Sequence, residues 1–168
     1  GREVYILLTG TFATPISSLI DNPLTTTTLG VQFGSSVNNG QAVDVYLTNA
    51  DTSLETAVPA ATLNFDGLSS QAEFASGTDY RIRITTVGST DVLYDSGTIS
   101  LQTSGNQIFL LVDYFGPGNS PFRVVSIASG VASSLQGEAL PAAIRVANFV
   151  TNTPSVDFYF NDTNDLPE

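Results

Sequence analysis

Short runs of strand-forming residues, separated by turn formers, recur along almost the whole of this chain of 168 residues. Turn-forming pairs such as Asn39-Gly40 and Asp66-Gly67 lie between the runs. The runs are rich in Val, Ile, Tyr, Phe and Thr and span 4–12, 29–37, 42–48, 61–65, 80–87, 91–95, 97–102, 106–115 and 122–128. Strands of this length and spacing are typical of sandwiches and barrels, so we predict an all-β fold.

Alternation of apolar and polar residues within the runs predicts which side chains are buried. In YRIRITT (80–86), Tyr80, Ile82 and Ile84 share one face of the strand, and the two arginines lie on the other. The same pattern applied to each run predicts a core of Val31, Phe33, Val43, Val45, Leu47, Leu63, Phe65, Tyr80, Ile82, Ile84, Leu93, Ile99, Phe109, Leu111 and Val124.

Two stretches of sequence occur twice. VDVY at 43–46 returns as VDFY at 156–159, an offset of 113 positions that also places Val31 on Ile144. GREVYILLTGTF (1–12) resembles GNQIFLLVDYFG (105–116) at an offset of 104. Periods of this size indicate tandem globular domains rather than a solenoid. The predicted organisation is closing strands of a partial repeat plus linker (1–28), a complete β-sandwich repeat (29–129), a linker (130–142) and opening strands of a further partial repeat (143–168).

The complete repeat resembles a family of bacterial extracytoplasmic immunoglobulin-like domains of unknown function, often arranged in tandem. The resemblance rests on AVDVYL (42–47) and on FASGTDYRIRITTVGSTDVLYDSGTISLQTSGNQIFLLV (74–112). It implies an immunoglobulin-like antiparallel β-sandwich, with one complete repeat flanked by partial repeats. It also implies export to an extracellular or cell-surface location. The family has no settled activity, so the resemblance carries over no catalytic residues.

Composition excludes several classes of partner and reaction. Sixteen acidic residues against five basic ones give a net charge of −11, which repels nucleic acid and anionic lipid. The chain contains neither His nor Cys, so it lacks an imidazole base and a thiolate nucleophile. A glycosidase needs only two carboxylates, but nothing in the sequence sets a pair such as Asp66 and Glu73 at a suitable separation. We predict a protein that is not an enzyme, needs no cofactor and does not insert into a membrane.

Oxygen-rich loops are weak candidates for calcium. Asn161, Asp162 and Asp165 lie together near the end of the sequence, and Asp51 lies in the related loop of the complete repeat. Oxygen ligands of this kind suit Ca²⁺, but the spacing of an EF-hand is absent. A solvated turn rich in Asn and Asp is the other reading, and we expect folding to need no metal.

The repeated Asp-x-Tyr of the VDVY strand has two readings. Asp44 and Tyr46 lie on the face opposite the predicted core, as do Asp157 and Tyr159 in the second copy. The aspartate could bind a ligand, or it could bond to a neighbouring loop. Tyrosines could also form a platform for sugar rings, so a carbohydrate-binding or adhesion module that recognises cell-surface glycan is the alternative function. The candidate rings are Tyr46, Tyr80, Tyr94 and Tyr114.

The terminal partial repeats suggest how copies of the chain meet. A strand without a neighbour leaves its backbone N–H and C=O groups unpaired. We therefore predict that residues 143–162 pair with residues 1–12 of another copy, so that strand complementation builds a head-to-tail filament of a structural protein. The alternatives are that both ends belong to flanking domains of a longer polypeptide, or that they fold back on their own chain. The predicted interface residues are Tyr5, Leu7, Val156, Phe158 and Phe160.

Overall fold

The computed structural model describes residues 2–10, 13–23, 28–37, 40–76, 79–116 and 118–139. Within these residues the secondary structure is all β, as predicted, and no helix capable of crossing a membrane occurs among them. The strands are β1 (Arg2–Gly10), β2 (Pro15–Pro23), β3 (Leu29–Ser35), β4 (Val43–Asn49), β5 (Ala61–Leu63), β6 (Ala72–Phe74), β7 (Asp79–Thr86), β8 (Val92–Ser100), β9 (Gly105–Asp113), β10 (Phe122–Ala128) and β11 (Val131–Leu135).

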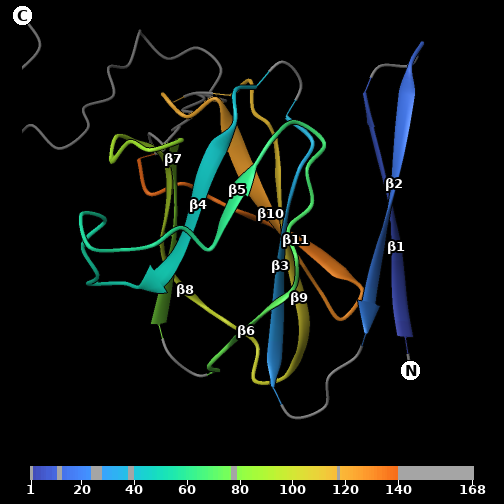
Figure 1. The fold of residues 1–168 in the computed structure, drawn as a ribbon, viewed down its shortest axis with the longest axis horizontal. Helices are drawn as coiled ribbons and strands as arrows, with labels where there is room; N and C mark the ends of the chain where they lie inside the picture. The colour runs from blue at the N-terminus through green and yellow to red at the C-terminus, as the bar shows by residue number, and fades with distance from the viewer. Residues whose placement is uncertain are drawn as a thin grey trace, which may run out of the picture.

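The strands from β3 onward form two sheets that face each other as a sandwich (Figure 1). The five-stranded sheet has the order β11-β10-β9-β3-β6, and the four-stranded sheet has the order β5-β4-β7-β8. Strands β3 and β9 run parallel, whereas the other strand pairs run antiparallel. Strands β1 and β2 form a separate hairpin beside the five-stranded sheet, on the side away from β4 and β7 (Figure 1).

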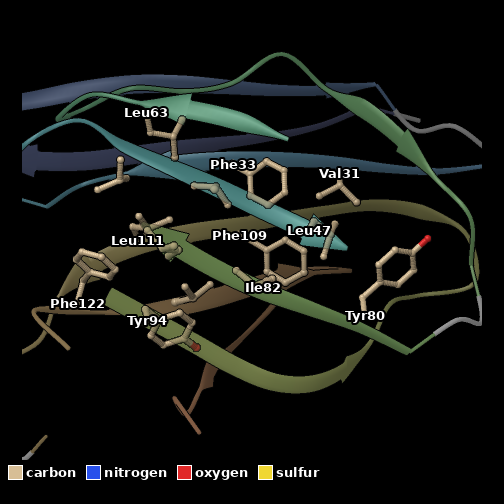
Figure 2. Packing of buried hydrophobic residues seen from close by; sticks show 14 of the residues in the cluster. Val31, Phe33, Leu47, Leu63, Tyr80, Ile82, Tyr94, Phe109, Leu111 and Phe122 are labelled. Atoms are coloured by element: carbon tan, nitrogen blue, oxygen red, sulfur yellow. The ribbon is translucent and has the colours of Figure 1, made fainter. Parts of the chain in front are cut away.

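The core lies between the two sheets and is centred on aromatic and β-branched side chains (Figure 2). The rings of Phe33 and Phe109, from the parallel pair, stack with centroids 5.9 Å apart. The predicted core residues belong to this cluster or pack against it, with the exception of Phe65. Strand β5 ends at Leu63, so the alternation no longer holds at Phe65, which lies half-buried in the following turn.

A bulge in β8 brings two consecutive side chains toward the core. Ile84 pairs with Tyr94 and Thr85 pairs with Val92, so Leu93 is the extra residue. Tyr94 is buried in the core and Leu93 packs against it. A second irregularity lets the predicted runs 91–95 and 97–102 join as the single strand β8. The core also contains residues outside the predicted set, namely Leu29, Tyr94, Leu101 and Phe122.

Strands β2, β6 and β11 were not expected from the sequence. Strand β11 occupies part of the predicted linker 130–142 and pairs with β10. Ser129 and Gly130, with φ of 50° and 75°, form the two-residue turn that joins them. Two consecutive positive φ values are the geometry of the tight hairpin turn whose twist matches that of the strands. The short Ala- and Ser-rich run is therefore held as a strand by its turn and its neighbour.

Candidate interaction surface

The β1–β2 hairpin is paired along its whole length. Its antiparallel register runs from Arg2 opposite Pro23 to Gly10 opposite Pro15. Because side chains alternate between the two faces of a strand pair, each face of the hairpin carries a separate set. We call Tyr5, Leu7, Ser18 and Ile20 the inner hairpin face, and Val4, Ile6, Leu8 and Leu19 the outer hairpin face.

The inner hairpin face is turned toward the sandwich. Ile20 is only 1% exposed, and the Ser18 hydroxyl donates a hydrogen bond of 3.5 Å to Asp66 Oδ1 in the turn after β5. Tyr5 and Leu7, which the sequence predicted as interface residues, are half-buried here. The burial of Ile20 and the bond of Ser18 place this face against the sandwich (Figure 1).

The sandwich offers an apolar surface on that side. Ile108 and Leu110 are buried, although they alternate along β9 with the core residues Phe109 and Leu111. They therefore lie on the outer face of the five-stranded sheet, outside the core cluster. The hairpin stands on this side of the sheet (Figure 1).

The outer hairpin face is an exposed apolar surface. Its residues are exposed by 52% at Val4, 70% at Ile6, 71% at Leu8 and 64% at Leu19. Four neighbouring aliphatic side chains in this state form a patch of the kind that marks interaction sites on soluble proteins. The sequence did not predict this face, because a strand at β2 was not expected and only the pairing of β1 with β2 brings Leu19 beside Ile6.

The hairpin also has open backbone edges. Among the described residues, β1 has one strand neighbour, β2, and β2 has only β1. An open edge presents backbone N–H and C=O groups to another strand. The predicted partner residues Val156, Phe158 and Phe160 lie outside the described residues.

The hairpin has the same arrangement as β9 and β10. Leu7 lies opposite Ser18 in β1–β2, and Leu111, its match at the offset of 104, lies opposite Val124 in β9–β10. Both pairs are antiparallel and connected directly in sequence. Segments that resemble each other in sequence thus form the first strand of a hairpin in both places.

Asp44 on the outer face of the four-stranded sheet has a structural role. It is buried, and its carboxylate accepts hydrogen bonds from the Thr62 hydroxyl at 2.5 Å and from the Gly88 backbone N–H at 2.8 Å. Gly88 lies in the turn between β7 and β8. This confirms the reading in which the aspartate bonds to a neighbouring loop. Asp157 lies outside the described residues.

Two arginines of β7 lie on the same outer face. Arg81 Nε donates to Asp95 Oδ1 at 2.6 Å, and the Arg81 guanidinium also pairs with Glu138. These bonds, the one to Asp95 first, raise the pKa of Arg81. Arg83 donates to the Thr48 hydroxyl and to a backbone carbonyl, and burial lowers its pKa. The two arginines therefore link β7 to neighbouring strands and loops.

Three of the tyrosines considered as a sugar platform are buried. Tyr80 and Tyr94 belong to the core, where their hydroxyls donate to the backbone carbonyls of Ala75 and Leu135. Tyr46 is also buried. A ring that stacks on a sugar must present a face to solvent, so none of these three can serve.

The structure does not group the acidic candidates into a site. Asp51 is exposed in the turn after β4, while Asn161, Asp162 and Asp165 lie outside the described residues. In the described part of the chain, no three His, Cys, Asp or Glu side chains lie close enough to hold a metal ion. Asp66 is bonded to Ser18, and Glu73 accepts a hydrogen bond from Thr28.

An apolar cavity of about 240 Å³ lies at one end of the sandwich. Its lining includes Val37, Val43, Phe65 and Phe122, and none of the described residues that line it is charged. It has room for a small apolar group.

Neither a family model nor a curated protein matches this sequence.

Proposed function

We propose that this chain is a structural or interaction protein, an extracellular β-sandwich unit of a tandem array, stalk or filament that assembles head to tail through β-strand pairing. The observation that carries the proposal is the β1–β2 hairpin. It lies outside both sheets of the sandwich, with an exposed apolar outer face and open edges within the described structure.

The repeated sequence supports the tandem arrangement. Strand β1 resembles β9 in sequence, and both strands pair antiparallel with the strand that follows them, as expected for the closing strands of a preceding repeat. The two sheets around one core are consistent with an immunoglobulin-like sandwich. Repetition suits length and avidity, because linked units bind neighbours at a high effective concentration. The resemblance to exported domains is what supports an extracellular location.

Light scattering coupled to size-exclusion chromatography tests the proposal over a range of protein concentrations. We expect the wild-type mass to rise above the monomer mass of 17.7 kDa as the concentration increases. The double variant Ile6→Lys with Leu8→Lys should remain monomeric, because lysines on the outer hairpin face resist burial. Its melting temperature should equal that of the wild type, since both side chains are exposed.

A matched control separates the hairpin from apolar surface in general. Val58 is 82% exposed in the loop after β4, and Val58→Lys should leave assembly unchanged. A wild-type chain that stays monomeric at every concentration would overturn the proposal. So would an Ile6→Lys, Leu8→Lys variant that assembles as well as the wild type.

A further inference from the structure

We propose that the open edge of β1 binds residues 142–148 of a second copy as a parallel strand, with Ala147 beside Ile6. The inference rests on the proposed head-to-tail assembly, and it adds the partner segment, the strand direction and the register.

The two neighbours of β9 indicate which kind of strand fits beside β1. Strand β9 lies between β10, which is antiparallel to it, and β3, which is parallel to it. Strand β1 matches β9 in sequence and has β2 in the position of β10. Among the described residues nothing occupies the other edge of β1. Among the described strands, the position beside β1 that corresponds to that of β3 beside β9 is therefore unfilled.

The sequence supplies a segment that matches β3. At the offset of 113, Leu29–Ser35 corresponds to residues 142–148, and Val31 corresponds to Ile144. Ile144, Val146 and Ala147 give this segment the apolar character that a strand buried between neighbours needs.

The two offsets fix a register. In the sandwich, Leu110 of β9 lies beside Gly34 of β3. Leu110 corresponds to Ile6 and Gly34 corresponds to Ala147, so Ile6 and Ala147 become neighbours. The next same-face pair along the strands is Val4 with Arg145.

The path of the chain indicates that the segment comes from another copy. The Glu138 backbone N–H donates to the Asp95 carbonyl of β8, so the described chain ends beside the four-stranded sheet. The hairpin stands beyond the five-stranded sheet (Figure 1), and packed sheets lie about 10 Å apart, so two such spacings separate β8 from the hairpin. Three residues span at most about 10 Å. Residue 142 therefore cannot reach β1 of its own chain in this register.

Cysteine cross-linking tests the strand direction and register, because the natural chain contains no cysteine. Four single variants are made: Val4→Cys, Ile6→Cys, Arg145→Cys and Ala147→Cys. They are mixed in pairs under mild oxidation, and linked peptides are identified by mass spectrometry. A disulfide needs Cα atoms about 4.4–6.8 Å apart, which directly opposite strand residues satisfy.

The parallel register predicts disulfides for Ile6→Cys with Ala147→Cys and for Val4→Cys with Arg145→Cys. The exchanged mixtures, Ile6→Cys with Arg145→Cys and Val4→Cys with Ala147→Cys, serve as matched controls and should remain unlinked. Disulfides in the exchanged mixtures instead would mean antiparallel pairing and would overturn the inference.

Two further outcomes separate this inference from the proposed function. Failure of all four mixtures to link, with a wild-type chain that still assembles in light scattering, overturns the parallel strand and leaves the head-to-tail array standing. A monomeric disulfide within one chain, in a double variant with Ile6→Cys and Ala147→Cys, would show that the segment binds its own hairpin. That result overturns the second copy as the occupant.

Discussion

The carboxylate of Asp44 in β4 accepts a hydrogen bond of 2.8 Å from the backbone N–H of Gly88, in the turn that joins β7 to β8. The same side chain accepts a bond from the Thr62 hydroxyl of β5. One buried carboxylate therefore holds the edge strand β5 and the β7–β8 turn to the strand between them.

Replacing Asp44 should destabilise the sandwich. Asp44→Ala leaves the Gly88 N–H and the Thr62 hydroxyl without their acceptor, and we expect a loss of about 1–3 kcal/mol in the free energy of unfolding. Urea denaturation followed by circular dichroism measures it. Asp91→Ala is the control variant. Asp91 is exposed, and in the described structure its carboxylate does not hold a distant turn as that of Asp44 does. Equal stability of the two variants would contradict the structural role.

The core and the hairpin should respond differently to the same substitution. Ile82 is fully buried between the sheets, so Ile82→Ala should cost about 2–5 kcal/mol through lost burial and a residual cavity. Ile6 is 70% exposed, so Ile6→Ala should change the stability of the monomer little. Thermal and urea unfolding of both variants checks the assignment. An unchanged midpoint for Ile82→Ala would show that β7 turns its other face inward.

Alkaline pH should destabilise the fold through Tyr94. Burial, with a smaller effect of the Asp95 charge, raises the pKa of Tyr94 above its ordinary value of about 10. Above that pH the unfolded chain loses the Tyr94 proton while the folded chain retains it. The unfolded state then binds fewer protons, so the free energy of unfolding falls as the pH rises.

Tyr94→Phe is the matched control for this pH effect. It removes the ionisable group, together with the hydrogen bond to the Leu135 carbonyl, and keeps the buried ring. Urea unfolding between pH 8 and about 11 should show a smaller alkaline loss of stability for Tyr94→Phe than for the wild type. Identical slopes in the two proteins would exclude Tyr94 as the source.

Salt should favour assembly. Each copy carries a net charge of −11, so copies repel one another at long range. Raising the ionic strength to about 0.1 M shortens the range of this repulsion to about 10 Å without weakening apolar contacts. Light scattering should therefore show a larger average mass at high salt. Dissociation on adding salt would instead indicate an interface held by ion pairs.

Removal of metal ions should leave the fold intact. Circular dichroism melts with and without a chelator should coincide, because the described core is built from apolar side chains. A melting temperature that falls with chelator and recovers only with Ca²⁺ would contradict this expectation. It would indicate that Asp51, or the loop around Asn161, Asp162 and Asp165, binds calcium.

Alternation predicted most of the core because it depends on local strand geometry. It assigned Val43, Val45 and Leu47 to the interior, and the structure agrees. It failed where that geometry is interrupted, as at Phe65 beyond the end of β5 and at the bulge that buries Tyr94 beside Leu93. A bulge depends on the partner strand, which a run of sequence read alone does not show.

Strands with weak propensity were missed for a related reason. Strand β2 begins and ends with proline and contains Ser17, Ser18 and Asp21, so its composition favours a loop. Its pairing with β1 outweighs that composition. The outer hairpin face depends on this pairing and so was not predicted, although the apolar residues on both faces of β1 were visible in VYILL. The Ser129-Gly130 turn before β11 was a signal that the sequence did contain.

The parallel pairing of β3 with β9 also bears on how fast the chain folds. Leu29 pairs with Gly105, so the sheet cannot close until most of the sandwich sequence has been gathered into one loop, at a cost in chain entropy that a hairpin does not incur. During that delay β1 competes with β9 for β3. Strand β1 resembles β9 in sequence and lies much nearer to β3 along the chain. The β1 strand of another chain can take the same place beside β3, so refolding at high concentration should trap chains in exchanged pairings, and the yield of native protein should rise on dilution.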